Sequence, residues 1–144
     1  MLKTLGRLVI ASTCVMSATL PAHAHFQLAY TPEVNVSRAG DQPVKLIFWH
    51  PFENGHVMDM AEPLDFYAVN RGKKIDLKST LSPASFTGGA NSAAAFDGVL
   101  TLRRSGDYVM VVVPAPYYEE SEDIFIQQIT KSYVSRNEIP TDWM

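Results

Sequence analysis

Side chains that commonly bind metals are concentrated in one short stretch, residues 48–60. It holds two imidazoles, two thioethers and two carboxylates: His50, Glu53, His56, Met58, Asp59 and Met60. Imidazole suits Zn, Cu and Ni, whereas thioether favours softer ions such as Cu(I). His50, His56, Met58 and Met60 are therefore candidate ligands for nickel, cobalt or copper.

The local sequence indicates how the two histidines are held. Pro51 biases His50 toward extended backbone geometry, and Asn54-Gly55 is a turn dipeptide that tolerates positive φ. We expect the histidines to flank a tight loop at the end of a strand. The alternative is an ordinary surface turn in which Met58 and Met60 are half-buried packing residues.

The first 24 residues have the features of a cleaved secretory signal peptide. Lys3 and Arg7 supply a positive start, residues 8–20 are mostly apolar, and Ala22-His23-Ala24 matches the small-x-small cleavage pattern. The apolar segment is too short to anchor the chain in a bilayer. We expect a periplasmic protein that begins at His25 and does not span the membrane.

Cleavage after Ala24 would make the terminus itself a metal chelator. His25 would carry a free α-amine beside its imidazole, and α-amines titrate near ~7.7 to 8, so a metal can displace the proton at neutral pH. Cleavage after Ala22 would instead place His25 third, a pattern that binds square-planar Ni(II) or Cu(II). His25 is therefore another candidate ligand, unless its place after the cleavage site is incidental.

Cysteine content and charge restrict the class of protein. The single cysteine, Cys14, lies in the signal segment, so residues 25–144 form no disulfide and must depend on core burial; 120 residues suffice for one domain. Loss of Lys3 and Arg7 changes the formal charge from −3 to −5. The remaining basic clusters are the dipeptides Lys73-Lys74 and Arg103-Arg104, so nucleic acid is not an expected ligand.

The sequence offers no catalytic motif. Residues 25–144 contain no cysteine nucleophile, Gly-x-Ser-x-Gly elbow, His-Glu-x-x-His helix or phosphate loop, so we predict that the protein is not an enzyme. An acidic group is a second candidate metal cluster: Glu119, Glu120, Glu122 and Asp123. Its alternative is a solvated turn between strands.

Alternating apolar and polar residues predict an all-β domain. Strands are expected over residues 26–30, 33–37, 43–49, 66–69, 75–77, 96–102, 108–113 and 124–134, and residues 70–74 resemble a hairpin tip. Residues 79–95 are expected to be a loop with at most one edge strand. Seven or eight short strands at this spacing predict an immunoglobulin-like antiparallel β-sandwich.

Several longer runs together resemble a known family. They are Ala22-His23-Ala24-His25-Phe26, Phe48-Trp49-His50-Pro51-Phe52-Glu53, Met58-Asp59-Met60, Ser105-Gly106-Asp107-Tyr108-Val109, Pro116-Tyr117-Tyr118-Glu119, Glu122-Asp123 to Ile126, and Thr130-Lys131. The chain is similar to the periplasmic accessory component of bacterial nickel and cobalt uptake, which has an immunoglobulin-like domain. The resemblance implies a soluble protein that binds Ni(II) or Co(II) and serves a transporter or outer-membrane receptor.

The resemblance leaves alternatives open. Members of that family continue beyond the segment equivalent to Trp143 into a second β-rich domain, so this chain is expected to be a fragment or a one-domain version. A second hypothesis is a periplasmic copper protein with His25 as a chelating terminus. A third is an interaction module that binds no metal and recognises a partner through Tyr117, Tyr118 and Trp143.

Overall fold

The computed structural model describes residues 26–51, 54–120 and 123–137, and these residues form twelve β-strands and no α-helix. The eight strands of four or more residues are β1 (Phe26–Tyr30), β3 (Gly40–Trp49), β5 (Asp65–Asn70), β6 (Lys73–Asp76), β7 (Ser82–Thr87), β8 (Ser92–Leu102), β9 (Gly106–Val113) and β12 (Thr130–Arg136). The shorter elements are β2 (Asn35–Val36), β4 (Val57–Met58), β10 (Tyr117–Glu119), β11 (Ile124–Ile126) and the 3₁₀ helix η2 (Lys78–Thr80).

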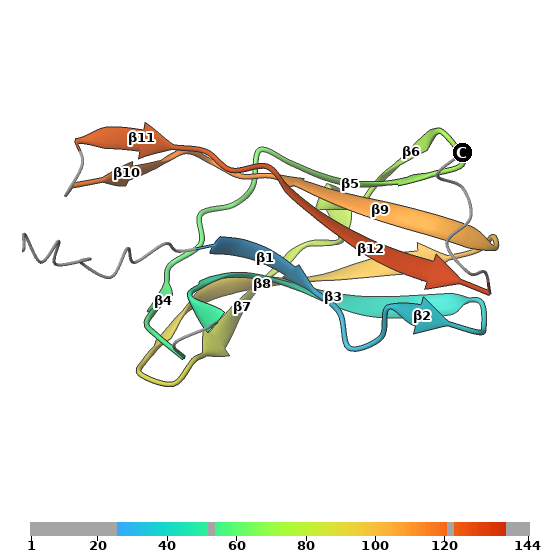
Figure 1. Ribbon diagram of the computed structural model, residues 1–144, viewed down its shortest axis with the longest axis horizontal. Coiled ribbons are helices and arrows are strands. Elements are labelled where there is room, and N and C mark those ends of the chain that lie inside the picture. The colour runs from blue at the N-terminus through green and yellow to red at the C-terminus, as the bar shows by residue number, and fades with distance from the viewer. Residues whose placement is uncertain (1–25, 52–53, 121–122, 138–144) are drawn as a thin grey trace, which may run out of the picture.

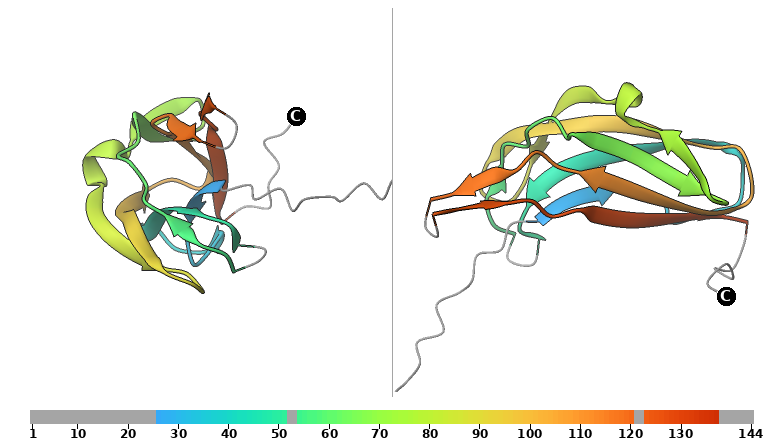
Figure 2. Two further views of the ribbon diagram at one scale, coloured as in Figure 1. Left: turned by 90° about the vertical axis from the view of Figure 1, so that its left-hand side faces the viewer. Right: turned by 90° about the horizontal axis from the view of Figure 1, so that it is seen from above.

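Two sheets face each other across the core (Figure 1). One has the strand order β1-β3-β8-β7 with β4 added beside β3, and the other has the order β2-β12-β9-β5-β6. The end-on view in Figure 2 shows the two layers enclosing the interior. This is the arrangement of an immunoglobulin-like sandwich, in which the first, second, fifth and fourth strands form one sheet. The predicted fold class is confirmed.

The core lies between the inward-facing positions of the two sheets. Its largest fully buried side chains are Tyr108, Phe66, Leu46, Leu100, Leu102 and Met110. They come from the central strands β3, β5, β8 and β9, where the predicted apolar alternation is strongest. The hairpin tip expected at residues 70–74 is also present: Asn70 pairs with Lys73, and Arg71 (φ 50°) and Gly72 (φ 73°) adopt the left-handed conformation that two-residue hairpins favour.

Residues 79–95 are more ordered than the sequence indicated. The expected edge strand is β7, but residues 92–95 also begin β8, the longest strand. Their small side chains have little apolar surface, which is why the pattern resembled a loop. Ala93 and Ala95 are nevertheless buried, because β7 covers this half of β8 in register.

Tyr108 anchors the turn between β8 and β9. Its hydroxyl accepts a hydrogen bond from the Arg104 backbone N–H and donates one to the Arg104 carbonyl oxygen, both at 2.9 Å. A tyrosine at this corner is a feature of immunoglobulin-like domains. Because both partners are backbone atoms, the hydroxyl fixes the turn whatever side chain residue 104 carries.

Tyr108→Phe should lower the free energy of unfolding by about 1–3 kcal/mol, because the Arg104 N–H and carbonyl lose their partner inside the domain. Urea denaturation at neutral pH measures the loss. Tyr30→Phe is the control, since the Tyr30 ring on β1 is exposed. An unfolding free energy unchanged by Tyr108→Phe would contradict the anchoring role.

In the part of the chain that the structure describes, we find no helix with the length and apolar character needed to cross a membrane.

Candidate functional site

His50 is the first residue after β3 and continues its inward-facing positions. Val44, Leu46 and Phe48 belong to the hydrophobic core, and side chains alternate between the two faces along a strand. His50 is accordingly only 8% exposed. Its ring stacks on Phe26 of β1, with the centroids 6.1 Å apart and the planes at 22°. One imidazole therefore sits at the edge of the core, between β1 and β4.

His56 occupies the facing position, directly before β4. Trp49 and Val57 are partners in the antiparallel register of β3 and β4. His50 follows this pair on one strand and His56 precedes it on the other, so the two histidines stand at the next step of the same register. His56 is exposed whereas His50 is buried, which places the pair at the boundary between core and solvent.

A compact loop joins the two histidines, as predicted. The Gly55 N–H donates to the His50 carbonyl oxygen at 3.2 Å, and the Asn54 N–H donates to that of Pro51 at 3.3 Å. Asn54 adopts a positive φ of 47°, as expected of this turn dipeptide. The Trp49 indole N–H donates to the Gly55 carbonyl oxygen at 3.0 Å, so the loop is tied back to β3.

The two methionines have different surroundings. Met58 is partly buried and packs against the core beside its register partner Phe48. Met60 is 4% exposed and belongs to the core itself. The Asp59 carboxylate accepts a hydrogen bond from the Ala94 N–H at 2.8 Å. Met58 is therefore the methionine nearer in register to the histidines, and Asp59 has a structural partner on β8.

Gln27 is a polar residue of this region that sequence reasoning missed. On β1 it is the register partner of Phe48, which lies two residues before His50 on the same face of β3. Its side-chain oxygen is buried without a hydrogen-bond partner among the described residues, although its backbone oxygen accepts from the Thr130 hydroxyl at 2.6 Å. The alternation in residues 26–30 would place the large apolar side chains of Phe26, Leu28 and Tyr30 inward and Gln27 outward, whereas Gln27 and Ala29 are the buried positions. Only the structure therefore identifies Gln27 as an inward-facing residue near the histidines.

An opening leads from solvent to this end of β1. Its volume is about 460 Å³, and it is lined by Phe26, Gln27, Leu28, Pro51, Gln128, Ile129 and Thr130. It lies beside the start of β12 and the residue that follows His50. The end of the sandwich that holds the histidines is thus accessible to a small solute.

Asn91 and Gly88 position β4, and neither was predicted. The Asn91 amide accepts from the Val57 N–H and donates to the Val57 carbonyl oxygen, both at 2.8 Å, so one side chain replaces a neighbouring strand. A Cβ at Gly88 would lie 2.5 Å from Val57 Cγ2 and 3.0 Å from Trp49 Nε1. The hairpin between β7 and β8 therefore packs directly against Val57, the residue that follows His56.

Asn91→Ala should detach β4. We expect a loss of about 1–3 kcal/mol in the free energy of unfolding, because the Val57 backbone loses both partners, and faster hydrogen exchange of the Val57 amide. Asn35→Ala, at an exposed position on β2, is the matched control. Unchanged exchange at Val57 in Asn91→Ala would show that other contacts hold β4.

The acidic group surrounds the β10–β11 hairpin. Glu119 pairs with Ile124 across it, and the Asp123 carboxylate accepts a hydrogen bond from the Tyr118 hydroxyl at 2.5 Å, which raises the pKa of Tyr118. Glu122 lies outside the described residues, as do Glu53 and His25. Within residues 26–51, 54–120 and 123–137, no three His, Cys, Asp or Glu side chains gather closely enough to hold a metal.

Comparison with known proteins gives a family. A family model described as a domain of unknown function (DUF4198) matches residues 22–144. No curated protein matches the chain, and no solved structure matches it. The model covers all of the sandwich described above, and we conclude that the chain belongs to the DUF4198 family.

Proposed function

We propose that the protein is a periplasmic accessory of nickel or cobalt uptake that binds the metal ion as cargo and presents it to a transporter or outer-membrane receptor. The proposed ligands are His25, His50 and His56, with Met58 as a further donor. Met60 supports the site by packing, since it lies in the hydrophobic core. The proposal combines the sequence resemblance with one observation on the register.

That observation concerns Trp49. It is the register partner of Phe26 on β1 and of Val57 on β4. In the sequence His25 directly precedes Phe26, His50 directly follows Trp49, and His56 directly precedes Val57. Two strand neighbours lie about 4.7–4.9 Å from the strand between them, and paired positions share a face of the sheet. A metal ion at the end of β3 could therefore draw on imidazoles from three adjacent strands.

The chemistry of these donors suits borderline metals. Imidazole nitrogens bind Ni(II), Cu(II) and Zn(II), and the α-amine of a processed His25 would add a fourth nitrogen without a further residue. The Gln27 side-chain oxygen and the Met58 thioether are further possible donors, since both residues pair with Phe48, two residues inward of His50. Because the set mixes one exposed and one buried histidine, the ion would stay near the surface, as release to a partner requires.

Calorimetric titration of the processed protein with Ni(II) and with Co(II) tests the proposal. We expect one ion per chain at neutral pH. Ser37→Ala, which changes an exposed residue before β3 and away from the histidines, should bind like the parent. Binding no tighter than about 1 mM, or about 4 kcal/mol, would rule out metal transport by this chain.

The alternative proposal is that the protein binds copper instead of nickel or cobalt. Copper binds more tightly than nickel at most nitrogen sites, so relative affinity does not separate the two. The metal content of protein purified from cells grown with defined amounts of both ions does. Copper as the dominant metal under those conditions would replace nickel and cobalt in the proposal.

A second candidate function rests on the β10–β11 hairpin. Phe125 is 75% exposed and Ile124 is 48% exposed, and Phe125 packs on Tyr118 with ring centroids 5.2 Å apart. Figure 1 shows the hairpin extending beyond the same end of the sandwich as β4. Such exposed apolar residues are typical of protein contact surfaces. Tyr117, by contrast, packs against Phe48, with ring centroids 4.9 Å apart.

The hairpin could be the contact through which metal reaches a partner, or an interaction site that needs no metal. Phe125→Ser should abolish partner association in both cases and leave metal stoichiometry unchanged. His56→Ala distinguishes the two cases, because it should weaken metal binding. Association that persists in this variant and in metal-free protein supports an interaction module that needs no metal. Tyr30→Ser, at another exposed aromatic residue on β1, is the control for general loss of apolar surface.

A further inference from the structure

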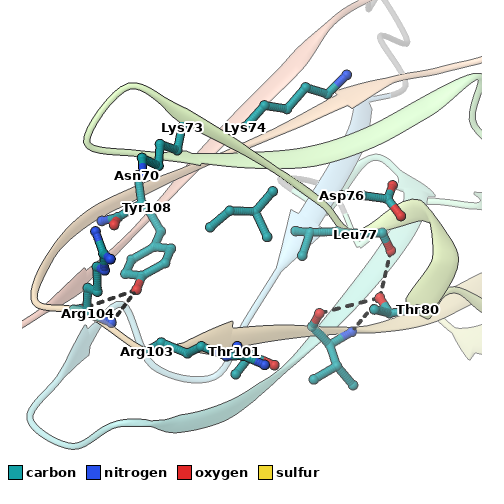
Figure 3. Close-up of a pocket in the computed structure, with 12 residues that line it drawn as sticks. Asn70, Lys73, Lys74, Asp76, Leu77, Thr80, Thr101, Arg103, Arg104 and Tyr108 are labelled. Carbon is teal, nitrogen blue, oxygen red and sulfur yellow. Dashed lines mark hydrogen bonds between the residues drawn. The ribbon is translucent and has the colours of Figure 1, made fainter.

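A pocket at the opposite end of the sandwich brings the two basic dipeptides together. Its volume is about 420 Å³, and Lys73, Lys74, Arg103 and Arg104 all line it. They come from β6 and from the end of β8, and Figure 3 shows the lysines on one side and the arginines on the other. In the sequence the two dipeptides are about 30 residues apart and form separate basic clusters. In the fold both dipeptides border one opening, with the Lys74 side chain directed away from the arginines (Figure 3).

The pocket is far from the histidines. Gly40, the first residue of β3, pairs with Leu102, the residue before Arg103, whereas His50 follows the last residue of β3. Ten strand residues separate the two ends, which corresponds to about 30 Å. The pocket is therefore independent of the proposed metal site.

The position of the pocket follows from the topology. β7 pairs with β8 only over residues 92–97, so beyond Asp97 this edge of β8 has no neighbouring strand. The Thr80 hydroxyl, at the end of η2, accepts from the Val99 N–H at 3.1 Å and covers one further residue. The opening lies between this uncovered edge and β6, the outer strand of the other sheet.

The base of the pocket is apolar. Leu77 and Tyr108 are buried and Ile75 is partly buried, and all three line the opening. Close to the base, Tyr108 fixes the backbone of Arg104 through its two hydrogen bonds. The Arg136 guanidinium donates to the Arg103 carbonyl oxygen at 3.1 Å. Both arginine side chains thus extend from an anchored backbone.

Three of the four positive charges are available. Lys74 forms an ion pair with Asp65 at 2.7 Å and lies 4.1 Å from the centre of the Tyr67 ring. For Lys73, Arg103 and Arg104, by contrast, we find no ion pair with any residue that the structure describes. Within the described part of the chain, no carboxylate pairs with these three side chains, so positive charge accumulates at the rim.

The acidic residue of the pocket is turned away from the arginines. Asp76 accepts a hydrogen bond from the Lys78 N–H at 3.1 Å, and Figure 3 shows its carboxylate directed away from Arg103 and Arg104. A hydrogen bond from the Ser79 side chain, supported by the backbone N–H groups of Lys78 and Ser79, holds the pKa of Asp76 below its ordinary value. Asp76 is thus engaged with η2, and does not occupy the rim as a built-in anion.

We propose that this pocket binds a small organic anion, with its apolar body against Ile75, Leu77 and Tyr108 and its carboxylate or similar group between Lys73, Arg103 and Arg104. A volume near 420 Å³ is within the range of small-molecule sites. Arginine side chains bind carboxylates through two parallel hydrogen bonds. Because the protein as a whole is acidic, with a formal charge of −3, the positive rim is a local feature that would select such a ligand.

NMR titration of the ¹⁵N-labelled chain with benzoate, acetate and benzamide tests the proposal. Benzoate should shift the backbone amides of Thr101 and Arg104 in a saturable way. Benzamide lacks the charge and should bind at least about tenfold more weakly, since a charged hydrogen bond contributes about that factor. Acetate lacks the apolar body and should also bind more weakly, because it buries no ring against the base of the pocket. No saturable shift with benzoate, or equal binding of benzamide, would overturn the proposal.

Variants separate charge from folding. The double variant Arg103→Gln with Arg104→Gln should weaken benzoate binding about tenfold or more, and it should fold, because the bonds from Tyr108 and Arg136 reach backbone atoms. Lys131→Gln removes an exposed charge on β12 and should leave binding unchanged. Benzoate binding that survives the double variant refutes the proposal. His50→Gln should have no effect, so this result and that for the metal site are independent.

Discussion

Replacing His50 should cause the largest loss of metal binding among single substitutions. We expect His50→Gln to weaken Ni(II) binding by more than about 100-fold, because changes that merely disturb the orientation of a ligand already cost 10- to 100-fold. His50 belongs to the middle strand of the three that would supply ligands, since β3 pairs with both β1 and β4. Calorimetry at neutral pH, with fluorescence competition for the parent protein, measures the difference.

The burial of His50 makes a stability control necessary. Glutamine approximates the size of imidazole, so His50→Gln should keep most of the packing on Phe26, whereas His50→Ala would leave a cavity. His56→Ala changes an exposed residue and should weaken Ni(II) binding without altering thermal unfolding. If His50→Gln retains the affinity of the parent while both proteins are folded, His50 is a packing residue and the proposed ligand set is wrong.

The fold was predictable because its central strands are strongly apolar. Residues 43–49 and 108–113 became the buried parts of β3 and β9, since each has enough β-branched and aromatic surface to specify a face. The hairpin at Asn70 to Lys73 was predictable from turn chemistry alone. The structure of residues 79–95 was not predictable. Ala93 and Ala95 of β8 are buried where β7 pairs with β8, but their small side chains carry too little apolar surface for the sequence to indicate a strand.

The ligand types could be identified from the sequence, but their arrangement could not. That His50 and His56 flank a loop follows from local turn residues. That Trp49 pairs with both Phe26 and Val57 depends on which strands neighbour β3, and that is a property of the whole sandwich. The same limit explains why Asn91, which lies 34 residues from Val57 in the chain, had no visible role in the sequence.

The basic dipeptides illustrate this limit on a larger scale. Lys73-Lys74 begins β6 after a short turn, and Arg103-Arg104 follows the end of β8. Interpreted locally, each dipeptide would belong to a separate solvent-exposed surface. They line one pocket because β6 and β8 are outer and inner strands of opposite sheets that face each other across the core. Pairwise proximity of this kind requires the strand order, which no local pattern contains.

The processed terminus should make the second large contribution to metal affinity. A chain that starts at His25 offers the α-amine and the imidazole together, whereas a Met residue placed before His25 moves the amine by one residue. We expect this Met-extended protein to bind Ni(II) about 100-fold more weakly, the lower end of the gain that covalently linked donors provide. Protein that retains residues 1–24 should show the same weakening, and mass spectrometry verifies each terminus.

Proton competition gives this prediction its pH dependence. Both donors bind metal only when unprotonated, and the ordinary pKa is ~6.5 for imidazole and ~7.7 to 8 for an α-amine. Affinity of the processed form should therefore fall steeply as the pH drops from 8 to 5, because two kinds of donor become protonated in turn. The Met-extended form depends on imidazoles alone, so its affinity should level off near neutral pH. Equal affinities for the two forms across this pH range would show that the terminal amine is not a ligand and that the ion depends on the loop histidines.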